Sequence, residues 1–276
     1  NGALASLSRA LSFSTLVYAD ATDEMDWIGS RDSWNELDKG AIGNFANEFA
    51  DDQFKYTAEA RYVADQAIVR LEGFDKAGTL ASRADLMRSY IYGAIIYSSI
   101  ADQYDDFAFS NKTVAAAPVG RANMGRLYDT SVGYLDKALA IATSNSDKYT
   151  ILALRARAKH GKGAWAKVTP KGTAAPANPL VNDAGAVADA TAAIALAAPD
   201  ATVDLINNVE ATAGTNIWYE VNGRNESAPG KVYVVDPTNA NKYVAAIKDP
   251  ISGTADPRMQ ARLTAFKAFE IGRAHV

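Results

Sequence analysis

The 276-residue chain contains no cysteine, and histidine occurs only at His160 and His275. Without thiols the chain cannot form disulfides, a thiolate nucleophile or a cysteine-ligated metal site. It also lacks the base that serine or cysteine catalytic arrangements need, because His160 lies beside Lys159 and Lys162 on what reads as a solvated helix face. The sequence therefore predicts no enzyme and no metal site, and it implies no cofactor.

A basic surface and a long hydrophobic run are missing as well. The formal net charge is −4 and the pI is about 5.3; because Lys and Arg are spread along the chain, we expect no nucleic-acid binding. No stretch reaches the roughly 18 apolar residues needed to cross a bilayer. An apolar fraction of 48% and a charged fraction of 22% indicate a folded protein with a sizeable core.

Both ends of the sequence indicate a truncated chain. The first residue is Asn rather than Met, and no leader precedes the first helical pattern. The last residues, Ile-Gly-Arg-Ala-His-Val, back-translate into a DNA string that resembles a common sequencing-library adapter. We therefore predict that residues 270–276 derive from an adapter and that residues 1–269 form a single, incomplete domain.

Apolar residues recur at three- and four-residue steps along much of the chain, which is typical of amphipathic helices. The second helix should begin at Asp51-Asp52, with Asp51 as N-cap, and residues 17–40 read as a long loop with one helical turn. A short turn at residues 145–147 predicts that its flanking helices pair as an antiparallel hairpin. The expected helices cover about 2–16, 51–72, 82–104, 124–143, 148–167 and 184–198.

The pattern changes beyond Pro199, where short runs rich in β-branched and aromatic residues appear. Such runs lie near Trp218, at Lys231–Val235 and at Tyr243–Ile247, and they indicate strands. The predicted fold class is therefore mainly α, built from helical hairpins with irregular loops and a small β element near residues 215–247.

The best candidate for a binding site is the polar, aromatic segment between the first two helices. Trp27 and Trp34 lie there with Asp23 and Asn35, outside any apolar stripe. Flat aromatic faces next to amide and carboxylate groups suit sugar rings, so these four are the candidate ligand-binding residues. The alternative is that both indole rings fill the gap between the two helices.

Three other patterns have simpler interpretations. Acidic clusters at residues 23–26 and 102–106 could supply the paired carboxylates of a glycoside hydrolase, but carboxylates at helix ends usually face solvent. Gly161-Lys162-Gly163 lacks the spacing and the hydroxyl residue of a phosphate loop; inside a helical pattern it predicts a close approach of two helices. Trp165 and Trp218 lie on patterned elements and are expected in the core.

The order of these segments resembles that of the SusD/RagB family of outer-membrane nutrient-binding lipoproteins. The opening Asn-Gly-Ala-Leu-Ala-Ser-Leu is similar to the family's first helix, and Asp23-Glu24 to the acidic pair that often follows it. Tyr104-Asp105-Asp106 resembles a Tyr-Gly-Asp-like segment in which Asp105 replaces the glycine. Leu135-Asp136-Lys137-Ala138 is similar to the family's Asp-Leu-x-x-Ala, and Asp256-Pro257-Arg258 to a downstream Asp-x-Arg element.

The resemblance implies a superhelix of tetratricopeptide-like hairpins in a surface-exposed lipoprotein of the outer membrane. Its partner would be a TonB-dependent, SusC-like transporter, to which it would deliver an oligosaccharide or another nutrient. The lipidated cysteine and leader of the family are absent here, which the predicted truncation explains. The family has no invariant ligand motif, so Asp23, Trp27, Trp34 and Asn35 rest on local chemistry alone. Two alternatives stay open: a helical-repeat adaptor that binds proteins, and a fragment of a glycoside hydrolase.

Overall fold

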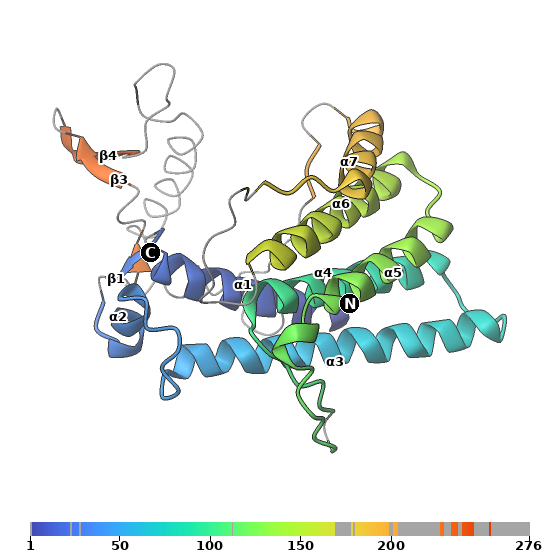
Figure 1. Ribbon diagram of the computed structural model, residues 1–276, viewed down its shortest axis with the longest axis horizontal. Helices are drawn as coiled ribbons and strands as arrows, with labels where there is room; N and C mark the ends of the chain where they lie inside the picture. Colours follow the sequence, from blue (N-terminus) through green and yellow to red (C-terminus); the bar gives the residue numbers. More distant parts are fainter. Residues whose placement is uncertain are drawn as a thin grey trace, which may run out of the picture. The chain divides into compact units, whose positions relative to one another are not determined.

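The computed structural model confirms a mainly helical protein (Figure 1). It describes residues 2–22, 24–27, 29–111, 113–168, 178, 180–198, 201–203, 227–228, 233–236, 239–245 and 254. In chain order the helices of these residues are α1 (Gly2–Ala21), α2 (Asp32–Asp38), α3 (Glu48–Lys76), α4 (Arg83–Gln103), α5 (Arg126–Ile141), α6 (Asn145–Val168) and α7 (Ala184–Leu196), with a 3₁₀ turn at Arg121–Asn123. Among the described residues, no helix combines the length and the apolarity needed to span a membrane.

The chain divides into two compact units. The first comprises Asn1–Leu11 and Phe54–Asn216, and the second comprises Ser12–Gln53 and Ile217–Val276. Helices α1 and α3 therefore contribute residues to both units. The expectation of a single domain over residues 1–269 stays a prediction, and residues 270–276 lie outside the described part of the chain.

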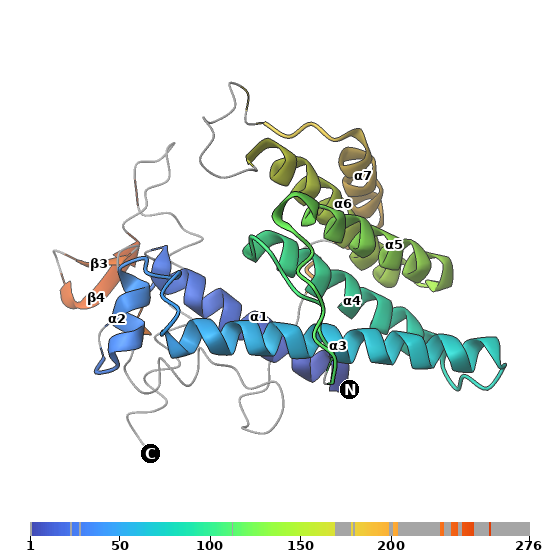
Figure 2. The ribbon, with the colours of Figure 1, turned by 60° about the horizontal axis from the view of Figure 1, so that its bottom comes forward.

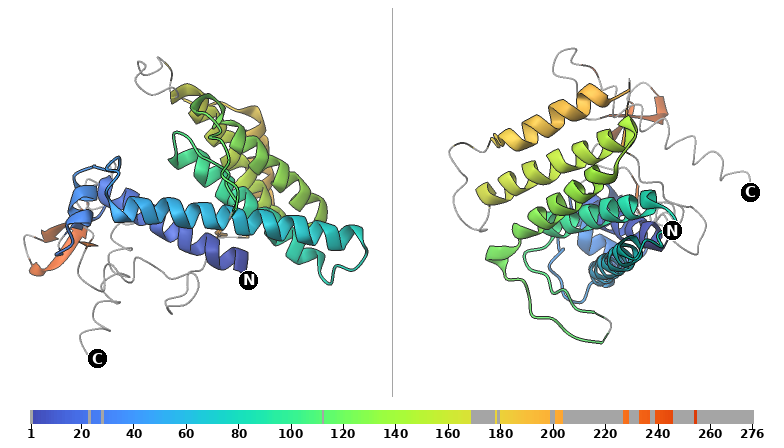
Figure 3. Two further views of the ribbon diagram at one scale, coloured as in Figure 1. Left: turned by 90° about the horizontal axis from the view of Figure 1, so that it is seen from below. Right: turned by 90° about the vertical axis from the view of Figure 1, so that its right-hand side faces the viewer.

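In the first unit the helices follow one another as a stack of antiparallel hairpins. Helices α4, α5, α6 and α7 pack each against the next (Figure 3, right), and α3 runs antiparallel beside α4 (Figure 2). Short connections force the antiparallel pairing of α3 with α4 and of α5 with α6. In the link from α3 to α4, Gly78 takes a φ of 70°, which only glycine adopts at little cost. The core of the stack includes Leu7, Ala60, Ile68, Leu86, Ile96, Ile100, Leu135, Ala138, Ile151 and Ala158.

Polar side chains fix where two helices begin, and both helices begin earlier than predicted: α3 at Glu48 rather than residue 51, and α6 at Asn145 rather than residue 148. Helix α3 begins at Glu48 because the Asn47 side-chain oxygen accepts hydrogen bonds from the backbone N–H of Phe49 (3.1 Å) and Ala50 (3.2 Å). The expected N-cap, Asp51, lies inside the first turn of α3 instead. Helix α6 begins at Asn145. The hydroxyl of the preceding residue, Ser144, accepts a hydrogen bond from the backbone N–H of Asp147 at 3.0 Å and so caps the helix.

The long connection between α4 and α5 is closed at its base by a carboxylate. Asp106 Oδ1 accepts hydrogen bonds from the backbone N–H of Phe107 and of Gly120, both at 2.8 Å. The N–H of Val119 also donates to the carbonyl of Phe107 at 2.9 Å. The two ends of this connection are therefore held together like the stem of a hairpin.

In the second unit, a short helix and a two-residue strand lie within the segment that was expected to be a loop. Between residues 17 and 40 lie the end of α1 and the whole of α2, so the described part of this segment contains more helix than the single turn predicted. Strand β1 (Asp26–Trp27) pairs antiparallel with β2 (Ser227–Ala228), and β3 (Tyr233–Asp236) pairs antiparallel with β4 (Asn239–Ala245). Strands thus occur in the predicted β region; Trp218 lies outside the described residues.

Candidate functional site

Trp34, one of the four residues nominated from the sequence, lies in the core of the second unit. Its side chain is 0% exposed and stacks on Phe49, with ring centroids 3.9 Å apart and planes at 19°. The indole N–H has no hydrogen-bond acceptor among the described residues. In this arrangement the ring offers no face to a ligand and fills space between elements, as in the packing alternative.

The other nominated residues lie near Trp34 where they are described. Trp27 is in β1, which packs beside α2, and its backbone N–H donates to Asp38 Oδ1 at 3.2 Å. Asn35 follows Trp34 in α2 and is partly buried. Asp23 lies outside the described residues. Ligand binding by this group stays a prediction.

The acidic cluster at residues 102–106 is engaged in internal contacts. Asp102 accepts from the Tyr128 hydroxyl and from Arg157, both at 2.6 Å, and Asp106 closes the base of the α4–α5 connection. Burial, with the nearby Asp102 carboxylate, raises the pKa of the Tyr128 phenol. No group of acidic or histidine side chains within the described ranges is arranged to hold a metal ion, and His160 is exposed, as predicted.

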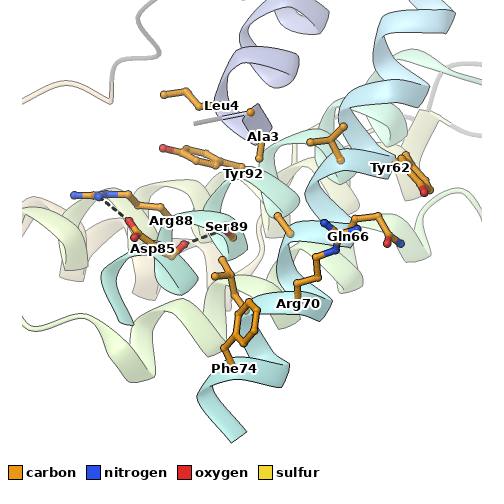
Figure 4. Close-up of a pocket in the computed structure, with 14 residues that line it drawn as sticks. Ala3, Leu4, Tyr62, Gln66, Arg70, Phe74, Asp85, Arg88, Ser89 and Tyr92 are labelled. Carbon is orange, nitrogen blue, oxygen red and sulfur yellow. Dashed lines mark hydrogen bonds and ion pairs between the residues drawn. The ribbon is translucent and has the colours of Figure 1, made fainter. Parts of the chain in front are cut away.

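A groove of about 1010 Å³ opens in the first unit between α3, α4 and the first residues of α1 (Figure 4). We call it the α3–α4 groove. Its aromatic lining comes from Tyr62, Phe74 and Tyr92, and its polar lining includes Gln66, Arg70, Asp85, Arg88 and Ser89. Ala3 and Leu4 of α1 close one side. The groove thus combines apolar ring surface with amide, guanidinium, carboxylate and hydroxyl groups.

Helical spacing places these side chains in the groove. On α3, Tyr62, Gln66, Arg70 and Phe74 follow one another at four-residue steps, which puts them in one row along a helix surface. A second row on α4 holds Asp85, Arg88, Ser89 and Tyr92. Because α3 and α4 are antiparallel neighbours, the two rows become the walls of one groove.

The charges of the groove are unevenly paired. Arg88 Nη1 lies 3.3 Å from Asp85 Oδ1, and both side chains are 60% exposed. Arg70 makes no hydrogen bond or ion pair with any residue that the structure describes. Burial raises the pKa of Tyr92, with Arg88 opposing and Asp85 reinforcing the shift, so this phenol stays protonated at neutral pH and can donate a hydrogen bond.

A second polar cluster, around Asp65, is already satisfied internally. Asp65 pairs with Arg61 at 3.3 Å and accepts from the hydroxyls of Tyr97 (3.1 Å) and Tyr134 (3.5 Å). Burial raises the pKa of Asp65, against the opposing effect of Arg61 and the two tyrosines. Arg61 is only 5% exposed and also donates to the carbonyl of Ser110. This cluster joins α3, α4, α5 and the α4–α5 connection, and it leaves little capacity for a ligand.

The groove residues were missed from the sequence, although a signal for them exists. The signal is a row of one aromatic and several polar residues at four-residue steps, as in Tyr62, Gln66 and Arg70. A similar row on the next helix faces it. Such rows are ordinarily read as solvated helix faces, since only the packing of α3 on α4 brings them together. Comparisons with known proteins add no further assignment: no family model, no curated protein and no solved structure matches the chain.

Proposed function

We propose that the protein captures an oligosaccharide in the α3–α4 groove. The observation that carries this proposal is the combination of aromatic rings and polar groups along the two walls, Tyr62 and Phe74 on one side and Tyr92 on the other. Sugar rings present apolar C–H faces and hydroxyl edges, which such a lining matches. In keeping with its resemblance to the SusD/RagB family, the protein would deliver the sugar to a TonB-dependent transporter at the outer-membrane surface.

The size of the groove fits a ligand of several sugar rings. Its volume of about 1010 Å³ lies at the upper end of the range for small-molecule sites, roughly 300–1,000 Å³. The groove is also partly open to solvent, which suits a chain that extends beyond the bound rings.

Binding without hydrolysis is the activity that the groove chemistry favours. Glycoside hydrolases need two carboxyl groups flanking the bond that is cleaved. Among the described residues, the groove lining contains a single carboxylate, Asp85, which is exposed and paired with Arg88. We therefore propose a binding protein rather than an enzyme.

Isothermal titration calorimetry with a panel of oligosaccharides tests the proposal. We expect Tyr62→Ala and Tyr92→Ala each to weaken binding about tenfold, since each removes a stacking surface. Phe45→Ala is the matched control, because Phe45 is 94% exposed in the second unit and its loss should leave affinity unchanged. If only Trp27→Ala abolishes binding, the site belongs to the segment nominated from the sequence.

A protein-binding adaptor is the second candidate, and α7 favours it. Val187 and Ile194, two turns apart on this helix, are 57% and 74% exposed. Apolar side chains in such a row are typical of helix docking surfaces. Tight binding of a peptide, with no response to any sugar in the same calorimetric panel, would favour the adaptor.

A further inference from the structure

We propose that the α3–α4 groove selects oligosaccharides that carry carboxylate groups, such as uronic-acid chains. This inference rests on the proposed function and narrows its ligand class. In the part of the chain that the structure describes, the groove lining holds two guanidinium groups, Arg70 and Arg88, against the single carboxylate of Asp85. A bound anion would therefore meet an excess of positive charge, even though the whole chain carries a net charge of −4.

Arg70 is the main determinant of this preference. It projects from α3 between Gln66 and Phe74 in the row that forms one wall (Figure 4). The acidic residues that flank it along α3 have other partners: Glu72 contacts Lys137 at 2.8 Å, and Asp75 contacts Arg83 at 3.2 Å. The charge of Arg70 is thus not neutralised by its neighbours on the helix.

Arg88 can contribute a second contact from the opposite wall. Its pairing with Asp85 joins two exposed side chains of one helix at a spacing of three residues, and such pairs contribute little to stability. The guanidinium can therefore turn toward a ligand at small cost. A planar guanidinium offers paired N–H donors that match the two oxygens of a carboxylate.

The neutral groups of the groove complete a uronate site. Tyr62 and Tyr92 supply ring surface for the sugar faces, and the Gln66 amide can exchange hydrogen bonds with hydroxyl groups. The stacking surface would bind acidic and neutral sugars alike, so discrimination between them falls to Arg70 and Arg88.

Calorimetric titration of the full chain with an oligogalacturonate and with its fully methyl-esterified counterpart tests the inference. The two probes share the same rings and differ in charge. We expect the free acid to bind at least about tenfold more tightly, since each charge-assisted hydrogen bond contributes that much. Raising the salt concentration should weaken binding of the acid and leave binding of the ester unchanged.

Variants locate the effect. Arg70→Gln should reduce the preference for the acid about tenfold or more. Arg88→Gln should reduce it less, because Arg88 must give up its ion pair with Asp85 when it binds the ligand. Arg126→Gln is the control, since Arg126 is an exposed arginine of α5 that does not line the groove. Circular dichroism should show unchanged helix content in all three.

The outcomes separate this inference from the proposed function. Equal affinities for the acid and the ester would overturn the carboxylate preference and leave oligosaccharide capture standing. Binding of neither probe, nor of any other sugar in the panel, would overturn both proposals. Tighter binding of a sulfated oligosaccharide than of the uronate would overturn the assignment to carboxylates.

Discussion

Gly161 illustrates how a single residue sets the distance between two helices. A Cβ atom at this position of α6 would lie 2.7 Å from Cε1 and 3.2 Å from Cζ of the Tyr128 ring. That ring cannot easily move, because Tyr128 is 3% exposed and its hydroxyl is hydrogen-bonded to Asp102. The close approach expected for residues 161–163 is thus confirmed, and the absence of a side chain permits it.

We predict that Gly161→Ala lowers the free energy of unfolding by roughly 1–3 kcal/mol, since overpacking a fixed ring outweighs the gain in helix propensity. Urea denaturation followed by circular dichroism measures the change. Gly133→Ala is the control, because Gly133 lies on an exposed face of α5 with nothing within 4 Å of its added Cβ. At that position the alanine should raise the free energy of unfolding by up to about 1 kcal/mol. If both variants stabilised the protein, the close contact between Gly161 and the Tyr128 ring would be contradicted.

At the scale of elements, a polar anchor holds α7 against α6. Helix α7 is rich in alanine, so it buries little apolar surface. Asp189, 6% exposed, accepts hydrogen bonds from Arg155 Nε (2.8 Å), Arg155 Nη2 (2.6 Å) and Lys159 Nζ (2.6 Å). Arg155 also reaches Asp136 of α5 at 2.6 Å, so one guanidinium links three successive helices.

We predict that Asp189→Asn lowers the free energy of unfolding by about 3 kcal/mol, because it leaves two cations without their buried counter-charge. Denaturant titration measures this loss. Asp129→Asn is the control: Asp129 pairs with Lys162 at 2.6 Å, but the side chains are 56% and 49% exposed, so its loss should cost less than about 1 kcal/mol. Equal effects of the two substitutions would argue against the anchor.

The same anchor has a pH signature. Burial opposes ionisation of Asp189, but hydrogen bonds from Arg155 and Lys159 outweigh it and lower the pKa below the ordinary value of 3.8. The stabilisation is therefore present above about pH 4 and is lost as the pH falls through the lowered pKa of the folded state. Asp189→Asn should accordingly flatten the loss of stability in acid relative to the wild type.

At the scale of the whole molecule, we expect the exposed apolar side chains on α7 to promote self-association. Val187 and Ile194 lie on one face of this helix and are more than half exposed. We predict concentration-dependent self-association, which the double substitution Val187→Lys and Ile194→Lys should reduce without changing the melting temperature. Size-exclusion chromatography with light scattering measures it.

Val69→Lys serves as the comparison for this prediction, since Val69 is 63% exposed on α3. The Val69→Lys substitution should reduce self-association less than the double substitution on α7 does. A wild-type protein that stays monodisperse at high concentration would show that the α7 face does not drive association.

The sequence was informative where one helix alone determines the outcome. The strong periodicity predicted helix 82–104, and α4 covers Arg83–Gln103. The prediction for the start of α3 was wrong, because the side chain of Asn47 takes the capping position that the pattern suggested for Asp51. Trp34 was a candidate ligand-binding residue because it lies in a polar segment, with packing between helices as the alternative; its ring is covered by Phe49 from a different helix. The groove depends in the same way on two helices, so no single-helix pattern reveals it.

The closure of the α4–α5 connection by Asp106 has a consequence for sequence change. Since the carboxylate joins Phe107 to Gly120 and Arg61 holds the Ser110 carbonyl, the helices on either side do not depend on how many residues follow Ser110 before the connection closes. Beyond this point the chain is largely exposed, around Val114 for example. Insertions, deletions or a fluorescent label there would leave the helical stack intact, which makes this segment the natural place for variation in length and for attaching a probe.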